Sequence, residues 1–247
     1  MLCDTTVSAQ KFSSDSPKNA IKWTPAPLLP PYKRIALSYE RVLTPSMSIN
    51  LRVAPSLPGG LSQGLIDRVS EDFGLLSANF KYRTMDITPE LRFYPSKEKD
   101  PLRGFYIGPF FRYSRFNMGA SAGEFVNDND NETYIGDFDG RLTLVGGGMI
   151  LGFQGLIGDA FVIDFNFGPG WGASKFSAIV SDVSTATAAD YEEYATDAKD
   201  RFDEFVRDTP LENAVTFDTE FDDNSGTATG KFGLPIIRLG LSFGYAF

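Results

Sequence analysis

Apolar and polar positions alternate along the C-terminal end of the chain. Large apolar residues occupy every second position from Ile237 to Phe247, and the positions between them hold small or polar residues. This period of two predicts a β-strand, because successive side chains of a strand point to opposite faces of the sheet. The apolar, aromatic face would point toward the core in a soluble protein and toward lipid in a membrane barrel.

The same alternation recurs upstream and predicts eight strands. They span residues 18–30, 33–43, 46–55, 78–94, 103–116, 139–153, 160–173 and 230–247. The strand over 78–94 has the least regular pattern, since its apolar positions change parity between Tyr82 and Leu91 and since Pro89 interrupts it. We expect a β-bulge there. In the strand over 103–116, Tyr106 and Phe110 blur the alternation.

From the second predicted strand onward, the connections between strands alternate in length, whereas the first connection, at Pro30-Pro31-Tyr32, is short although an external loop is expected there. Those near 44–46, 95–102 and 154–159 are short, and those near 56–77, 117–138 and 174–229 are long. Membrane barrels have short turns on one side of the membrane, long loops on the other and an even number of strands. The sequence therefore predicts an all-β, eight-stranded, antiparallel up-and-down transmembrane β-barrel as a single domain over residues 18–247. Residues 1–17 are expected to be a disordered tail or the remnant of a signal sequence.

The long connection over 174–229 contains a segment with helical spacing. Between residues 187 and 206, the larger apolar side chains fall on one face of a helix, and acidic residues lie largely off that face. The aromatic residues of this stripe are Tyr191, Tyr194, Phe202 and Phe205. We expect a helix outside the membrane, whose apolar stripe either packs on the mouth of the barrel or binds a partner protein.

Composition narrows the function further. The chain carries a net charge of −9, which argues against a nucleic-acid partner and disfavours peripheral binding to anionic lipid. It has no histidine, which removes most acid–base triads and most zinc sites. The run Gly146-Gly147-Gly148 lacks the Gly-Lys-Ser/Thr of a phosphate loop and fits a bend or a close approach of strands. We therefore expect a non-enzymatic protein without a cofactor.

Charged residues occur on the polar face of several predicted strands, which would point into the barrel. They are Glu40, Arg52, Glu90, Arg92, Arg112, Asp164 and Arg238. Eight strands enclose little more than their own side chains, so these residues are expected to pair in an ionic network that fills the lumen. A transport path or an acid–base site is the alternative.

A run of acidic and amide residues offers a candidate calcium site. Asp128, Asp130 and Glu132 place carboxylates at alternate positions, as calcium-binding loops do. Thr133 stands where the EF-hand loop requires glycine. A solvated loop is therefore the favoured interpretation, and no metal is expected.

Aromatic residues near the predicted strand ends are typical of the girdles of membrane barrels. The candidates are Trp23, Tyr39, Tyr94, Trp171 and Tyr245. The core of a soluble barrel would use the same residues, so this pattern supports a membrane barrel without deciding for it.

Three segments of the chain and its last strand carry a family resemblance. The segments Lys18–Trp23, Leu37–Arg41 and Pro89–Tyr94 resemble a family of Bacteroidota outer-membrane barrels of unknown function, which are small barrels loosely akin to the OmpW and OmpX types. The alternating residues Leu239, Leu241, Phe243, Tyr245 and Phe247 resemble the β-signal that the barrel-insertion machinery reads. The resemblance implies a bacterial outer-membrane location, with outer-membrane lipid and the insertion machinery as partners. It implies no activity.

These features predict a non-enzymatic outer-membrane barrel that acts through its long external loops. One hypothesis is a structural or accessory subunit that docks to an envelope protein complex. A second is an OmpW-like conduit that admits a small apolar ligand through an opening in the barrel wall. A third is a soluble lipocalin-like binding barrel, in which apolar residues would point inward and Glu40, Arg52, Asp164 and Arg238 would face water.

Overall fold

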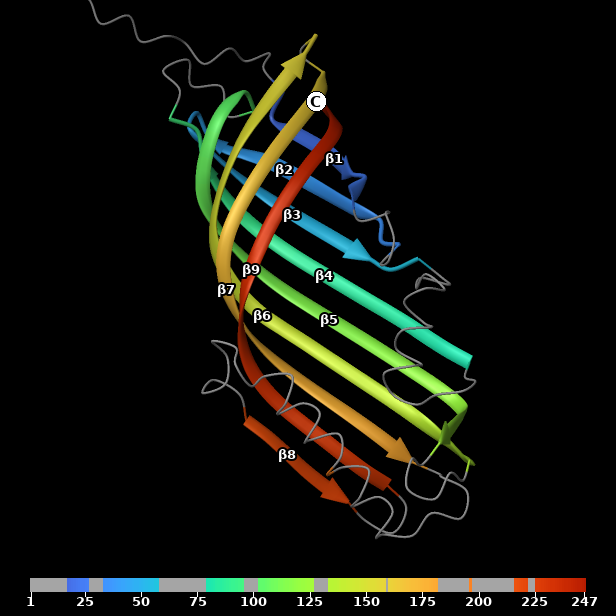
Figure 1. The fold of residues 1–247 in the computed structure, drawn as a ribbon. Coiled ribbons are helices and arrows are strands. Elements are labelled where there is room, and N and C mark those ends of the chain that lie inside the picture. The colour runs from blue at the N-terminus through green and yellow to red at the C-terminus, as the bar shows by residue number, and fades with distance from the viewer. Residues whose placement is uncertain are drawn as a thin grey trace, which may run out of the picture.

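Nine antiparallel strands make up most of the described chain in a computed structural model of the protein (Figure 1). The structure describes residues 17–26, 33–57, 79–95, 102–126, 133–158, 160–181, 196, 216–221 and 225–247. The strands are β1 (Asn19–Thr24), β2 (Ala36–Thr44), β3 (Met47–Pro55), β4 (Asn79–Phe93), β5 (Gly104–Val126), β6 (Thr133–Ile157), β7 (Phe161–Ser181), β8 (Thr216–Phe221) and β9 (Ser225–Ala246).

Eight of these strands close into a ring. Strands β1 to β7 pair in chain order, β7 pairs with β9, and β9 pairs with β1 from Trp23↔Phe243 to Ala20↔Ala246. Strand β8 stands outside the ring and pairs with the opposite end of β9, from Phe221↔Gly226 to Thr216↔Lys231. The expected antiparallel up-and-down barrel is confirmed, and β8 is an addition to it.

Four strands continue well beyond their predicted ends. Strands β5, β6, β7 and β9 contain 23, 25, 21 and 22 residues, and Figure 1 shows them curving far past the shorter β1, β2 and β3. Parts of 117–138 and 174–229 that were expected to be loop are therefore strand, and β8 lies in the second of these segments. The pattern missed them because large apolar residues do not recur there at every second position over a long run.

The first two strands are shorter than predicted. Strand β1 ends at Thr24 rather than near residue 30, and β2 begins at Ala36 rather than at residue 33. Pro25 follows β1 directly. Because proline has no backbone N–H to donate to a neighbouring strand, it commonly ends a strand or stays at an edge.

The prediction of a β-bulge in β4 is wrong. The register of β4 is constant against β3 from Met85 to Phe93, and the ladder to β5 skips Pro89 but resumes at Glu90 in the same register. The parity does not change either. Tyr82 lies on the inner face of the strand, so it is an aromatic residue among the inward polar positions rather than a sign of a shifted apolar face.

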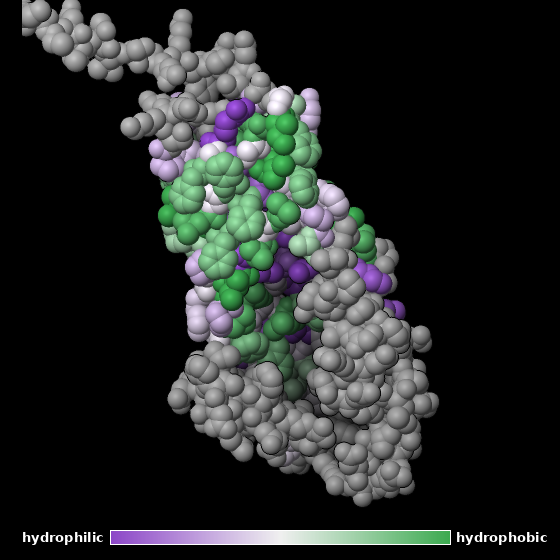
Figure 2. All heavy atoms as spheres, turned by 45° about the horizontal axis from the view of Figure 1, so that its top comes forward, coloured by the Kyte–Doolittle hydropathy of each residue, from purple (hydrophilic) through white to green (hydrophobic). Residues whose placement is uncertain are grey.

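The barrel is apolar outside and polar inside. The outward residues Ile237 and Tyr245 are 71% and 60% exposed, whereas the inward Glu40 and Arg92 are 0% and 1% exposed. Figure 2 shows hydrophobic residues gathered over the outer wall. A soluble lipocalin-like barrel needs the opposite arrangement, so that hypothesis is wrong.

The three consecutive glycines of β6 let neighbouring strands approach closely. A Cβ added to Gly148 would lie 2.1 Å from the carbonyl oxygen of Pro169, and one added to Gly146 would lie 2.5 Å from the Cα of Gly172. The expected close approach is confirmed at both positions.

Candidate functional site

The candidate site is a set of charged side chains inside the barrel, near its short turns. Strand alternation turns these residues inward from five strands, and all are buried. We call them the central cluster: Lys22 on β1, Glu40 on β2, Glu90 and Arg92 on β4, Asp164 on β7 and Arg238 on β9. Three cationic groups meet three carboxylates, so the formal charges cancel.

Lys22 and Arg92 bind the same two carboxylates. The Lys22 ammonium donates to Glu40 Oε2 at 2.5 Å and to Asp164 Oδ2 at 2.8 Å. The Arg92 guanidinium donates through Nη1 to those same oxygens at 3.0 and 2.9 Å. Both cations also donate to Gln154 Oε1, at 2.8 and 3.2 Å. The two cations therefore hold β1, β2, β4, β6 and β7 together across the lumen.

Glu90 joins two arginines. Arg92 donates to Glu90 Oε2 through Nε at 2.9 Å and through Nη2 at 2.8 Å, while Arg238 Nη2 pairs with Glu90 Oε1 at 2.5 Å. Asn50 Nδ2 also donates to Oε1, at 2.9 Å. Charge-assisted and forked hydrogen bonds of this kind are the strong ones in proteins.

Uncharged hydroxyl groups donate hydrogen bonds to the carboxylate oxygens that the cations do not reach. Glu40 Oε1 accepts from the hydroxyl of Tyr94 at 2.8 Å and from that of Ser48. Asp164 Oδ1 accepts from the hydroxyl of Tyr106 at 2.7 Å. The Arg92 guanidinium also stacks 4.3 Å from the centroid of the Tyr106 ring. Every carboxylate oxygen of the central cluster therefore has a donor, which buried charges require if they are to be stable.

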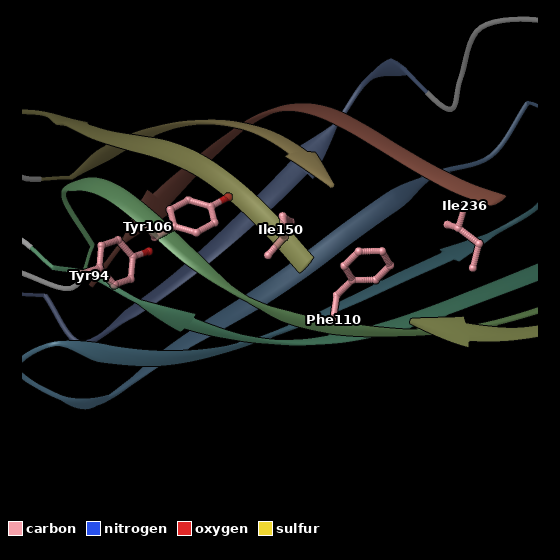
Figure 3. Packing of buried hydrophobic residues seen from close by; sticks show 5 residues of the cluster. All are labelled: Tyr94, Tyr106, Phe110, Ile150 and Ile236. Atoms are coloured by element: carbon pink, nitrogen blue, oxygen red, sulfur yellow. The ribbon is translucent and has the colours of Figure 1, made fainter. Parts of the chain in front are cut away.

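A column of apolar side chains fills the part of the interior next to the central cluster. Tyr94, Tyr106, Phe110, Ile150 and Ile236 form one buried hydrophobic cluster, and Figure 3 shows their side chains following one another between the walls of the barrel. Gly152 makes room for it, because an added Cβ would lie 2.3 Å from Cζ of Tyr106. Tyr94 was expected in an aromatic girdle, but it is 1% exposed and belongs to this column.

The remaining predicted charges lie beside the central cluster rather than in it. Asp86 accepts from Arg34 and, at 3.2 Å, from Arg112 Nη2. Arg112 Nε also donates to Ser114 Oγ at 2.9 Å. Arg52 is half-buried on the inner face of β3 and forms no ion pair with the described residues. The structure thus places five of the seven predicted residues in one ionic network and the other two next to it.

Sequence reasoning missed Lys22, Gln154, Tyr94 and Tyr106 as members of the site. Lys22 stands between the outward residues Ile21 and Trp23, so the alternation of the strand already indicates that its side chain points inward. Gln154 fell in a predicted turn, which is strand in the structure. Parity could have assigned Lys22, Tyr94 and Gln154 to the interior once the strands were correctly bounded, whereas the apolar residues on both faces around Tyr106 obscured its side.

Other predicted sites fall wholly or largely outside the described residues. The helix predicted over 187–206, with Tyr191, Tyr194, Phe202 and Phe205, lies outside them except for Thr196, which is helical and exposed. The calcium candidates Asp128, Asp130 and Glu132 also lie outside them. Within the described segments, no cluster of metal-ligating side chains occurs.

The residues compared with an insertion signal lie on the outer face of β9. Leu239, Leu241, Tyr245 and Phe247 are exposed, and Phe243 is half-buried against Phe161, with ring centroids 6.4 Å apart. No helix in the described segments is long and apolar enough to cross a membrane.

The fold and the site define a closed antiparallel β-barrel with an apolar outer wall and an interior that holds a cluster of paired charges and an apolar column. Residues 36–200 match the model of the family described as "Protein of unknown function (DUF3575)", and the chain belongs to this family. The Bacteroidota origin and the kinship with OmpW-type barrels stay predictions. None of the curated proteins compared matches the sequence.

Several solved structures show a distant likeness. CarO of Acinetobacter baumannii is 11% identical over 87% of this chain and 97% of its own, with a TM-score of 0.37. A major outer membrane protein of Thermus thermophilus is 12% identical over 93% of this chain and 98% of its own, with a TM-score of 0.33. The outer membrane protease OmpT of Escherichia coli is 9% identical over 94% of this chain and 93% of its own, with a TM-score of 0.36. Values this low transfer no function.

Proposed function

We propose that the protein is a non-enzymatic outer-membrane β-barrel with a sealed lumen, which holds the extended ends of β5, β6, β7 and β9 outside the membrane. The observation that carries the proposal is the combination of an apolar outer wall with an ionic cluster across the interior, in which every charged side chain has an ion-pair partner. A water-soluble barrel gains nothing from this sidedness, whereas a barrel in lipid requires it.

The height of the apolar wall supports a membrane location. Before the first exposed charged residue, which is Lys175 on β7 and Lys231 on β9, the large exposed apolar residues run from Phe161 to Trp171 on β7 and from Phe247 to Ile237 on β9. Ile179 is exposed beyond Lys175. Ten residue steps cover roughly 34 Å along a strand, or about 26 Å across a membrane when the strand is tilted by about 40°. The apolar band of outer-membrane barrels is about 25 Å tall.

The location is tested by fractionation of native cells and by gel migration with and without boiling. We expect recovery in the outer membrane and a band that shifts on heating, because a folded barrel resists the detergent until it is heated. A soluble protein whose migration does not change on boiling would contradict the proposal.

The sealed lumen is tested in planar bilayers. We expect no steady conductance from the folded wild-type protein, because the central cluster and the apolar column occupy the interior. The variant Lys22→Ala/Arg92→Ala should conduct, whereas Lys18→Ala/Arg41→Ala, which removes two exposed charges, should not. Steady conductance of the wild-type protein would contradict the sealed lumen.

We further propose that the protein serves as a structural or accessory subunit of an envelope protein complex. The support is the apolar stripe in the sequence of 187–206, which lies in the long connection between β7 and β8. Deletion of 187–206 should release the partner in a pull-down while the heat-dependent gel shift of the barrel is kept. Association that survives this deletion would rule out the helix as the contact.

A conduit for a small apolar ligand is the second candidate function, and one feature of β9 favours it. Between Phe232 and Leu241, β9 pairs with β7 on one side, but its other edge has no strand partner among the described residues. Ile236 of the apolar column lies in this stretch and points inward. Uptake of an apolar fluorescent dye into vesicles that carry the protein tests this function. Uptake equal to that of protein-free vesicles would exclude it.

A further inference from the structure

The outer wall changes from apolar to cationic at one level of the barrel. Counted from the short-turn end of each strand, the first charged outward position is basic on β4, β5, β6, β7 and β9. We call these residues the basic belt: Arg83 on β4, Arg115 on β5, Arg141 on β6, Lys175 on β7 and Lys231 on β9. All five side chains are exposed.

The strand register places the basic belt in two adjacent rows. In the lower row Arg115 pairs with Thr143, Thr143 with Lys175, and Lys175 with Lys231. In the row above, Asn117 lies between Arg83 and Arg141. Five cationic groups therefore follow the circumference of the wall. They come from five strands that lie far apart in the sequence but are neighbours in the barrel.

The charges of the basic belt are not balanced by carboxylates within the described segments. Arg115 Nε and Arg141 Nε both donate to the neutral Oδ1 of Asn117, at 3.3 and 3.4 Å. None of the five residues forms an ion pair with a described residue. The outward acidic residues stand farther along the strands, at Asp137 and Asp139 on β6 and at Asp218 and Glu220 on β8.

A groove crosses the boundary between the basic belt and the apolar wall. It has a volume of about 500 Å³ and is lined by Val145, Ala173, Lys175, Lys231 and Gly233, among others. By register, the two lysines form one row, and Val145, Ala173 and Gly233 form the row next to it on the apolar side. Trp171 packs beside Gly233, since a Cβ added to that glycine would lie 3.1 Å from the indole nitrogen. Tryptophan is enriched where the hydrocarbon of a membrane meets the headgroups.

The negative net charge of the chain does not reflect the charge of the barrel wall, because the acidic residues are concentrated in one segment. Residues 182–224 contain 14 acidic and 3 basic residues, a net charge of −11, so the rest of the chain carries +2 of the total of −9. The expectation that net charge disfavours contact with anionic lipid therefore applies to that segment and not to the barrel wall.

We propose that the basic belt binds the phosphate groups of a phosphorylated membrane lipid, with one of its acyl chains in the groove between β6, β7 and β9. This proposal rests on the proposed membrane location. Guanidinium and ammonium groups are the preferred protein partners of phosphate, and the apolar floor of the groove continues into the lipid-facing wall. A free phosphate ion would use the lysines but not the groove.

Lipid binding is measured on the full chain in neutral detergent, with diphosphorylated lipid A as the probe. The substitution Trp23→Phe leaves Trp171 as the single tryptophan, and its fluorescence reports on the groove. Each basic residue near a charged membrane surface contributes roughly a fivefold change in affinity. We expect Lys175→Gln/Lys231→Gln to weaken binding roughly 25-fold.

The matched control is Lys18→Gln/Arg41→Gln, which removes the same charge from exposed positions at the opposite end of the barrel. It should bind lipid A as the wild type does, and dephosphorylated lipid A should bind the wild type as weakly as diphosphorylated lipid A binds the lysine variant. Equal binding by the lysine variant and the wild type would overturn the proposal. Equal binding of the two lipids would do the same, as would full competition by inorganic phosphate.

Three further outcomes separate this proposal from its alternatives. If the lysine variant exposes 182–224 to protease while lipid A binding is unchanged, the basic belt holds that acidic segment and the lipid proposal is overturned. If the variant keeps its heat-dependent gel shift in lipid vesicles but loses no affinity, the basic-belt proposal fails alone. If the wild type never inserts into vesicles, the proposed membrane location fails as well.

Discussion

Replacing Arg92 by methionine tests whether the central cluster is a desolvated ionic network. Arg92 is 1% exposed and donates to Glu40, Glu90 and Asp164. Methionine keeps much of the side-chain length but leaves the three carboxylates with only two cations. Breaking a buried ionic network by removing one partner destabilises a protein by about 3–5 kcal/mol. The ratio of folded to unfolded protein should then fall roughly 100- to 5,000-fold.

The assay is equilibrium unfolding by urea in lipid vesicles, followed by tryptophan fluorescence and by the gel shift of unboiled samples. Arg41→Met is the matched control, because Arg41 is exposed on the outer face of β2. A surface substitution of this kind changes stability by about 0.5 kcal/mol or less. If Arg92→Met lowers the free energy of unfolding no more than Arg41→Met does, the interior is hydrated and the reasoning on burial is refuted.

A double-mutant cycle extends this test. Asp164→Asn removes one carboxylate, and the double variant Arg92→Met/Asp164→Asn restores the formal neutrality of the cluster. We expect the double variant to be more stable than the two single effects imply, with a coupling energy of about 1–3 kcal/mol. Additive effects would mean that Arg92 and Asp164 act independently, despite the 2.9 Å between them.

Three further predictions address other contacts. Gly148→Ala should destabilise the barrel by about 1–3 kcal/mol, since its Cβ would lie 2.1 Å from the carbonyl oxygen of Pro169, and urea unfolding against the control Gly155→Ala measures this. Tyr106→Phe should reduce the free energy of unfolding by about 1.5–3 kcal/mol through the lost hydrogen bond to Asp164, and a smaller change would mean that water replaces the hydroxyl. Phe247→Ala should slow membrane insertion of the newly made protein without preventing refolding in detergent, and unchanged outer-membrane levels in cells would contradict a role in the insertion signal.

The alternation of side chains was sufficient to predict the ring of strands and which charges point inward. Glu40, Glu90, Arg92, Asp164 and Arg238 are all buried inside the barrel, and each was assigned by parity alone. The rule failed where both faces of a strand carry aromatic residues, as at Tyr106 and Phe110. It also failed where neither face is apolar, as in the outer parts of β5 to β9.

The pairing of the charges was not predictable from the sequence. Lys22 and Asp164 are 142 residues apart, and they meet because β1 and β7 both flank β9 in the closed ring. Parity states only that a side chain points inward. Its height in the barrel depends on the stagger between strands, which is set by the closure of the ring. The ion-pair partners therefore become visible only once every register is known.

The central cluster and the basic belt constrain the barrel differently, and in the proposed membrane location they would together determine its height. The charges of the central cluster are buried and paired, whereas those of the basic belt form no ion pair with the described residues and require a polar or anionic surrounding. A shift by two residues along β7 moves the wall by roughly 5 Å. In one direction it would bring Lys175 and Lys231 into the hydrocarbon, where each cation becomes costlier toward the midplane, by up to about 2–4 kcal/mol. In the other direction it would expose Phe161 and Phe247 to water at the opposite rim. In the proposed membrane location the barrel therefore has one favoured level, which would hold the outer sheet of β5 to β9 at a fixed height above the membrane.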